Sequence, residues 1–277
     1  MRVYERKRGV YLSAKNTKSL KGIFAAVVLI HHLYQYSGIG NGTVIGLIFQ
    51  WMGYLAVGMF FFYTGYGLML SSRKDGYLNA FVLKRVVPLY VFHVCLILIY
   101  TIYKTILGID INPKEVTQSF LFGGTVVPLA WYLQVTIVIY LIYYLVFRSI
   151  KRDSIRLGVM FVALTLFCVI CYVCNLSSTW YESSFCVLLG MVWFYRKEKI
   201  DEVLKRKGIL TLFSVALLCA MFTLMQMKLG TISKMLSAVT FSAMVTIFTY
   251  LVSDAKIVDN KITQFLGRYS LEIYVSQ

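Results

Sequence analysis

The sequence predicts an all-α protein, a polytopic bundle of about nine to ten transmembrane helices with a cytoplasmic N-terminus. Hydrophobic residues make up 59% of the 277 residues and charged residues only 14%, whereas about a quarter of the residues of a soluble domain are charged. Apolar runs of about 17–25 residues recur along the chain, and each can cross a hydrocarbon core about 30 Å thick. We therefore expect a multi-pass protein of the cell (plasma or inner) membrane.

Nine apolar segments are the predicted spans, and they follow a basic N-terminal arm over residues 1–21. A break of the second span near Gly53 is left open, because glycine weakens the interior of a helix. The last span begins at Phe265 and stops about halfway through a bilayer, so we expect it to be incomplete. Residues 22–277 then form one transmembrane domain. The spans cover residues 22–37, 44–70, 82–103, 129–147, 157–174, 182–195, 209–227, 235–252 and 262 to the end.

The basic residues predict the orientation of these spans. Most of the 28 Lys and Arg residues fall in the N-terminal arm or in connections on the same side of the membrane. Cytoplasmic connections carry an excess of Lys and Arg, so this side is predicted to be cytoplasmic. The net charge of +16 therefore reflects topology and contact with membrane lipids, and we expect no nucleic acid partner. The four exceptions, on the other side, are Lys104, Lys114, Lys228 and Lys234.

The longest connection runs from Lys104 to Pro128 on the predicted outer face. Its glycines and prolines indicate turns, and its length suits a lid or a re-entrant segment over a site. A solvated loop fits the same sequence equally well, so both interpretations stay open.

Three cysteines, Cys168, Cys171 and Cys174, have a spacing that resembles a ligand set. They lie inside an apolar span, however, and a metal site needs a fourth ligand and a polar second shell. We interpret them as small packing residues and expect no metal site.

Ionisable side chains inside a membrane are costly and mark functional sites. His32 lies eleven residues beyond Lys21, about 16 Å along a helix, and His93 lies eight residues beyond Arg85, about 12 Å. The similar depth predicts a polar cavity shared by the two imidazoles, although a buried histidine with a satisfied partner is the simpler alternative. His31 and His32 point about 100° apart, so we expect one to face the site and the other to bond a neighbouring helix.

Charged residues also lie at the predicted cytoplasmic boundary. Lys84 and Arg85 stand at the start of the third span, and with Lys21 they form a basic collar suited to diphosphate groups; snorkelling to the interface is the alternative. Glu272, inside the last span, follows Arg268 by four residues, and an ion pair within the helix is its expected role.

A series of short phrases follows in a fixed order along the chain. Lys21 replaces an arginine in the first phrase, and Val82 replaces the first of two arginines in the third. Together the phrases resemble those of the acyltransferase family 3 membrane proteins. They are Lys21-Gly22 with His32, Val57–Leu68, Arg85 with Pro88, Trp131-Tyr132-Leu133, Phe185 with Gly190, and Leu266–Val275.

The resemblance implies a membrane-bound O-acyltransferase, an enzyme that transfers groups other than amino-acyl groups. It would move an acyl group, acetyl above all, from acyl-CoA to a hydroxyl of a cell-surface carbohydrate, glycolipid or glycoside. Acyl-CoA (acetyl-CoA) would be a co-substrate, with no bound cofactor. His32 would act as general base or would carry the acyl group itself, and Lys21, Lys84 and Arg85 would bind the donor. The other residues expected to line the site are His31, His93, Tyr66, Trp131 and Tyr132.

Two functions of other classes stay open. A proton-coupled transporter uses intramembrane histidines and acids in relays, although no repeat between the two halves of the chain supports one. An inactive membrane scaffold of the same fold is the other alternative, because Lys21 and Val82 depart from the family's pattern.

Overall fold

The structure is a computed structural model that describes residues 11–39, 42–124, 126–206, 213–214, 216–217, 220, 230–251 and 260–275. The described residues contain helices and no strands. The chain divides into two compact units. Unit 1 comprises Met1–Leu70 and Glu182–Gln277, and unit 2 comprises Ser71–Tyr181.

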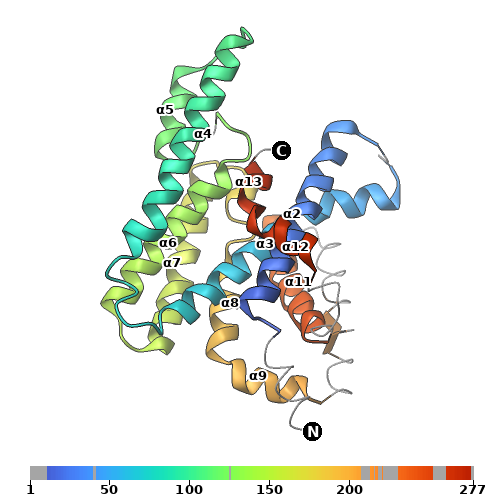
Figure 1. Cartoon of the computed structure of the whole chain (residues 1–277), viewed down its shortest axis with the longest axis vertical. Coiled ribbons are helices and arrows are strands. Elements are labelled where there is room, and N and C mark those ends of the chain that lie inside the picture. The colour runs from blue at the N-terminus through green and yellow to red at the C-terminus, as the bar shows by residue number, and fades with distance from the viewer. Residues whose placement is uncertain are drawn as a thin grey trace. The chain divides into compact units, whose positions relative to one another are not determined.

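Unit 1 joins the beginning of the chain to its end. Two of its helices, α2 and α12, lie side by side (Figure 1), and α8 packs against both α3 and α11. Ser13 begins α2, since its hydroxyl accepts a hydrogen bond from the backbone amide of Asn16 and so satisfies one free amide of the first turn. The helices are α2 (Ala14–Ser37), α3 (Val44–Ser71), α8 (Phe185–Tyr195), α9 (Lys197–Leu204), α11 (Thr231–Leu251), α12 (Lys261–Arg268) and α13 (Ser270–Val275).

Unit 2 is built around α6, which packs against both α4 and α7. Pro88 lies just after the junction of η1 and α4 and has no amide proton to donate to the preceding turn. The elements are the π-helix η1 (Val82–Val86), α4 (Val87–Ile106), α5 (Pro113–Leu121), α6 (Trp131–Ser149), α7 (Asp153–Val173) and the 3-10 turn η2 (Ser178–Trp180).

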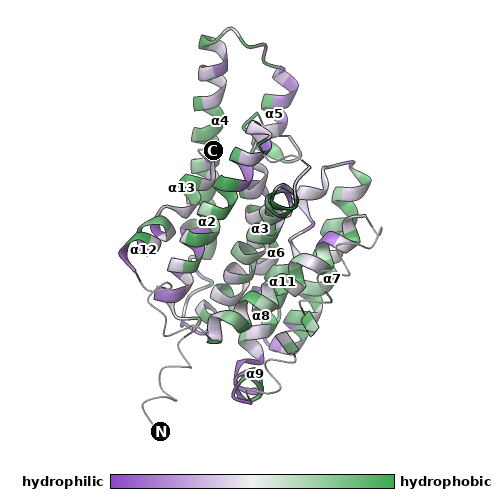
Figure 2. Cartoon of the chain, turned by 90° about the vertical axis from the view of Figure 1, so that its right-hand side faces the viewer, coloured by the Kyte–Doolittle hydropathy of each residue, from purple (hydrophilic) through white to green (hydrophobic). Residues whose placement is uncertain are grey.

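Five described helices are long and apolar enough to cross a membrane. Hydrophobic residues predominate along them in Figure 2, whereas α9 and α5 are largely hydrophilic. The prediction of an all-α membrane protein is thus confirmed, while the count of nine to ten spans and the side of the N-terminus stay predictions. The five are Val44–Ser71, Val82–Ile106, Trp131–Ser149, Asp153–Val173 and Thr231–Leu251.

Three expectations about the spans differ from the structure. The second span does not break at Gly53, because α3 runs unbroken through it; a single glycine costs about 1 kcal/mol in a helix, and a long apolar helix tolerates that. The sixth span is shorter than expected, since α8 has only 11 residues. The last segment forms two short helices that meet at Tyr269. The seventh predicted span, residues 209–227, lies largely outside the described residues.

The break at Tyr269 also removes the expected partner of Glu272. The guanidinium of Arg268 lies over the ring of Tyr269, 5.6 Å from its centroid. Among the ion pairs of the described residues, none joins Arg268 to Glu272. The expectation of that pair was wrong, because an i to i+4 pair needs a continuous helix.

Glycine permits a close helix crossing in unit 1, between α3 and α8. A β-carbon on Gly65 would lie 1.9 Å from the carbonyl oxygen of Val187, and one on Gly190 would lie 2.1 Å from the carbonyl oxygen of Phe62. Small residues allow helix backbones to approach in this way in membranes. Gly65 and Gly190 belong to two of the phrases quoted above, so these phrases meet in the fold.

A second glycine crossing joins α2 to α12. A β-carbon on Gly22 would lie 2.3 Å from the carbonyl oxygen of Thr263, and one on Gly267 would lie 1.8 Å from that of Lys18. The first and the closing phrases of the sequence are therefore packed backbone to backbone. This contact holds the lower part of α2, the helix that carries both His31 and His32.

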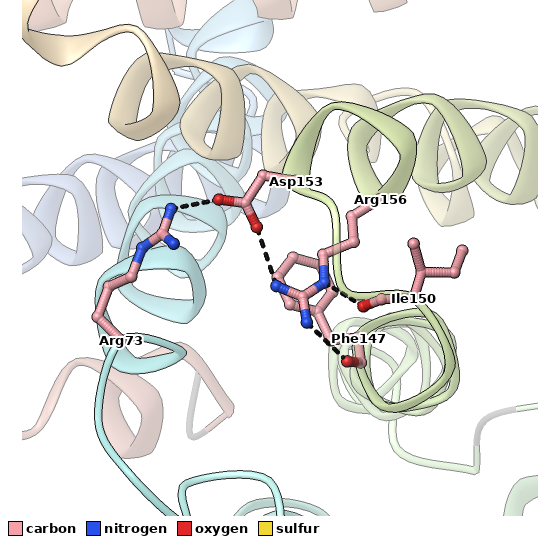
Figure 3. Close-up of polar contacts among 5 residues, drawn as sticks. All are labelled: Arg73, Phe147, Ile150, Asp153 and Arg156. Carbon is pink, nitrogen blue, oxygen red and sulfur yellow. Dashed lines mark hydrogen bonds and ion pairs between the residues drawn. The ribbon is translucent and has the colours of Figure 1, made fainter.

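In unit 2, Arg156 ties the turn between α6 and α7 together (Figure 3). Its guanidinium donates to the carbonyl oxygens of Ile150 at 2.6 Å and Phe147 at 3.0 Å, and to a carboxylate oxygen of Asp153 at 2.9 Å. The other carboxylate oxygen of Asp153 binds Arg73. The cluster thus satisfies carbonyls at the end of α6, which a helix leaves without partners.

We expect Arg156→Gln to destabilise unit 2 by about 2–3 kcal/mol, since hydrogen bonds to charged groups contribute about 1.5–3 kcal/mol and the Arg156 side chain is only 15% exposed. Thermal denaturation of the purified protein in detergent measures the loss. Arg152→Gln is the matched control, because Arg152 is exposed in the same turn and should change the midpoint little. Equal midpoints for the two variants would contradict the role given to Arg156.

Candidate functional site

His31 connects α2 to α3. Its Nδ1 donates to the carbonyl oxygen of Phe49 at 2.6 Å, and its ring lies against Gly53, where a β-carbon would be 2.4 Å from Nε2. The side chain is buried, with 8% of its surface exposed. His31 therefore makes an interhelical hydrogen bond, and Gly53 leaves the room for its ring.

His32 is arranged differently from its neighbour. It is partly exposed, and its Nδ1 donates to Oε1 of Gln35 at 3.1 Å, one turn further along α2. A neutral imidazole carries one proton, so this bond leaves Nε2 with a free lone pair. The rings of His31 and His32 lie 5.0 Å apart at 61°. An imidazole held in this tautomer is equipped to accept a proton or to act as a nucleophile through Nε2.

His93 lies in a buried polar cluster of unit 2. Its Nε2 donates to the carbonyl oxygen of Ser119 at 2.8 Å, and the side chain is 1% exposed. The amide nitrogen of Gln134 donates to the carbonyl oxygens of Ser119 and Gly124, both at 2.9 Å. Nδ1 of His93 consequently carries a buried lone pair, for which the described residues provide no donor.

The later part of the connection over residues 104–128 is packed, whereas residues 105–110 and 112–114 are exposed. Asn112 caps α5, since its Oδ1 accepts a hydrogen bond from the amide of Lys114 at 2.9 Å. The hydroxyl of Ser119 accepts from the amide of Val126 at 2.7 Å, and Oε1 of Gln134 accepts from the amide of Gly123 at 3.2 Å. These bonds fasten α5 and the following turn over His93, so only the exposed first part of the connection fits the alternative of a solvated loop. Whether the segment acts as a lid stays open.

Gln134 is a residue that the sequence reasoning missed. It is 3% exposed and lies one residue after the phrase Trp131-Tyr132-Leu133, at a position where the span is otherwise apolar. A lone amide in such a span was the available signal, because a buried amide must find hydrogen-bonding partners. The partners themselves are carbonyls of the connection and were not readable from the sequence.

Glu182 was also missed, because it stands at the edge of the expected sixth span. Only 4% of its surface is exposed, and its Oε2 lies 3.3 Å from Nζ of Lys234. The next residue, Ser183, donates from its hydroxyl to the carbonyl oxygen of Tyr54 at 2.9 Å. An acid at the start of an apolar span is the signal that was available in the sequence. Unit 1 thus holds an ion pair between a buried acid and a lysine whose side chain is 48% exposed.

The remaining predicted site residues are divided between the units. Tyr66 is buried in unit 1 with its ring 5.4 Å from that of Phe194, so it packs between α3 and α8. In unit 2, Tyr132 is buried and its ring lies 6.2 Å from that of Trp131. A role of these aromatic residues in lining the site stays a prediction.

The three basic residues expected to bind the donor lie at the beginnings of helices or near them. Lys84 and Arg85 are exposed on η1 of unit 2, and Lys21 is partly exposed on α2 of unit 1. The basic collar and the cavity shared by His32 and His93 would each be formed by residues of both units. Both stay predictions. What each unit offers by itself is a histidine whose tautomer is fixed by a hydrogen bond.

Comparison with known proteins gives one match. The family model described as an acyltransferase domain matches residues 18–277. No curated protein and no solved structure matches the chain.

Proposed function

Because the chain belongs to the acyltransferase family 3, we propose that it moves an acyl group, acetyl above all, from acyl-CoA to a hydroxyl of a cell-surface carbohydrate or glycoside. The observation that carries the proposal is the arrangement of His32. Its Nδ1 is bonded to Gln35, and its Nε2 keeps a lone pair on a partly exposed side chain of α2, the first predicted span, which is not among the five candidate spans.

In the proposed reaction His32 acts as general base. Nε2 accepts the proton of the acceptor hydroxyl while the hydroxyl oxygen attacks the carbonyl carbon of the thioester. The carbon–sulfur bond then breaks, and the imidazolium returns the proton to the sulfur that leaves. The products are an ester and free CoA, and His32 ends in its starting state. General base catalysis of this kind contributes about 10²–10⁴-fold.

A second route uses the same nitrogen as a nucleophile. Nε2 attacks the thioester carbonyl carbon, the carbon–sulfur bond breaks, and CoA leaves as the thiolate, with the acyl group on the imidazolium; the acceptor hydroxyl then attacks the acyl carbon, the bond to Nε2 breaks, and the proton of the hydroxyl balances the thiolate. This route permits the acyl group to reach an acceptor on the other side of the membrane from the donor. Rapid quenching with labelled acetyl-CoA in the absence of acceptor distinguishes the routes, since only the second labels the protein.

Lys21, Lys84 and Arg85 are the proposed donor-binding residues. Cations bind diphosphate and phosphate oxygens through charge-assisted hydrogen bonds, and all three stand near the predicted cytoplasmic boundary, where acyl-CoA is available. Lys21 is on the same helix as His32 and about 16 Å from it along the axis. The thioester end of a donor held by Lys21 would have to extend along α2 to react there.

The proposed function is tested by the surface glycans of cells with and without the gene. Mass spectrometry should find an O-acyl group that depends on the gene, and membranes from the same cells should transfer label from acetyl-CoA to that glycan. If the glycans are identical and labelled acyl-CoA does not bind the membranes, the proposal fails, and the proton-coupled carrier becomes the better account.

A further inference from the structure

We propose that an anionic phospholipid of the cytoplasmic leaflet occupies a groove of unit 1, with its phosphate at Arg196 and Lys199 and one acyl chain along the apolar wall. The groove encloses about 530 Å³, within the range of about 300–1,000 Å³ that is usual for binding sites. Apart from the two cations, the described side chains that line it are all apolar. They are Leu189, Val192, Trp193, Ile200, Val203, Leu204, Phe213, Leu217, Ala243 and Ile247.

The floor of the groove is one face of α9. Arg196 directly precedes α9. The groove residues Lys199, Ile200 and Val203 lie three, four and seven positions after it, so all four share one side of the helix. The two cations stand at the end of α9 that adjoins α8, and the apolar residues follow them. Both cations are exposed, as is Val203 at 52%. A single surface thus presents positive charge next to a strip of hydrocarbon, which matches the two parts of a phospholipid.

The opposite face of α9 is fixed to the body of unit 1. Lys197 and Asp201 form an ion pair, and the buried hydroxyl of Tyr11 donates to Oδ1 of Asp201 at 3.0 Å. Burial raises the pKa of the Tyr11 phenol, so the phenol keeps the proton that it donates. Because its other face is held in this way, α9 presents the groove as a formed surface.

Trp193 links the two sides of this arrangement. Its indole nitrogen donates to the Tyr11 hydroxyl at 2.8 Å, so its polar atom is satisfied away from the groove and its ring adds apolar surface to the wall. The described wall of the groove therefore presents apolar side chains along its length, which suits a hydrocarbon chain better than a peptide or a sugar. Its charge lies only at the end where a phosphate would sit.

The predicted topology supports a lipid as the occupant. Arg196 and Lys199 lie on the basic face of the protein, which is predicted to be cytoplasmic, and anionic lipids are attracted to basic residues at that face. Exposed apolar side chains at this depth, such as Val192 at 37% and Phe213 at 55%, are in contact with acyl chains in a membrane. An anionic headgroup would give one of these chains a preferred position.

The test is native mass spectrometry of the purified full-length chain with phosphatidylglycerol and with phosphatidylcholine of the same acyl chains. We expect tighter binding of phosphatidylglycerol, and we expect Arg196→Gln with Lys199→Gln to weaken it about 30-fold, which corresponds to about 1 kcal/mol for each cation. Lys151→Gln with Arg152→Gln removes the same charge from exposed residues of another connection and should leave the affinity unchanged. Ala243→Trp, which places a large ring in the groove, should weaken both lipids.

Three results would overturn the proposal. Equal binding of the two lipids would remove the role of the phosphate, and equal losses in the two double variants would show a general effect of charge. Displacement of the lipid by free CoA would assign the groove to the donor. None of these results depends on acyl transfer, so the proposed function stands or falls separately.

Discussion

His32→Ala is expected to reduce acyl transfer in membranes to the background rate while the protein is still made and folded. Nε2 of His32 carries a free lone pair, because the hydrogen bond to Gln35 engages Nδ1. Loss of a general base lowers the rate of acyl transfer about 10²–10⁴-fold. The His32 side chain is partly exposed, and its hydrogen bond is to Gln35 of the same helix. Removing the imidazole should therefore cost little stability. Transfer of label from acetyl-CoA, divided by the amount of folded protein, is the measurement.

His31→Ala is the matched control for this experiment. The variant loses the hydrogen bond to the partly buried carbonyl oxygen of Phe49 and leaves a space against Gly53, so stability should fall by about 1–3 kcal/mol through the lost bond and the lost packing. Activity per folded molecule should survive in part, since His32 keeps its own partner. If His32→Ala keeps near wild-type activity while His31→Ala is folded but inactive, the roles of the two histidines are the reverse of those proposed.

The apolar runs of the sequence predicted five of the described helices well. Residues 44–70, 82–103, 129–147, 157–174 and 235–252 were expected to be spans, and the structure has apolar helices over the same regions. Length and hydropathy are sufficient here because a bilayer requires continuous helices. The expectations that failed concern how helices end. The shortness of α8 and the break at Tyr269 depend on what surrounds the chain there, which composition does not record.

The candidate site was predictable as residue types but not as partners. The cost of a charge in a membrane was enough to single out His31, His32 and His93. The sequence did not identify their acceptors, because the carbonyls of Phe49 and Ser119 belong to other segments and every residue carries a carbonyl. Gln134 and Glu182 were missed for the same reason: the contacts that explain their burial come from segments far away in the sequence.

Gly65→Ala is expected to have the largest effect on stability of any single methyl group added to α3. The new β-carbon would lie 1.9 Å from the carbonyl oxygen of Val187, and that oxygen belongs to backbone, which cannot turn aside as a flexible side chain does. Overpacking usually costs about 1–3 kcal/mol and occasionally more, and we expect this variant at or above the upper end. Size-exclusion chromatography after heating in detergent should show early loss of the monodisperse protein.

Gly67→Ala is a control on the same helix, two residues away. A β-carbon there meets nothing within 4 Å, and alanine favours a helix over glycine by about 1 kcal/mol, so this variant should be as stable as the wild type or more so. Gly190→Ala adds a methyl group to the same crossing from the other side, 2.1 Å from the carbonyl oxygen of Phe62. In the double variant the loss of stability should be smaller than the sum of the losses in the two single variants, because either change already separates the two helices.

The comparison of Gly65→Ala with Gly67→Ala also separates packing from catalysis. Both glycines belong to the phrase Val57–Leu68, which resembles the family's pattern, and a direct role of the whole phrase in the reaction would make both variants inactive. The geometry instead predicts that only Gly65 is sensitive, and that its loss reduces the amount of folded protein more than the activity of what remains. Equal stability of the two variants would contradict the close crossing of α3 and α8. If Gly65→Ala alone lowers stability, the glycine of this phrase serves to bring two helix backbones together, and α3 then holds the carbonyl of Phe49 where His31 binds it.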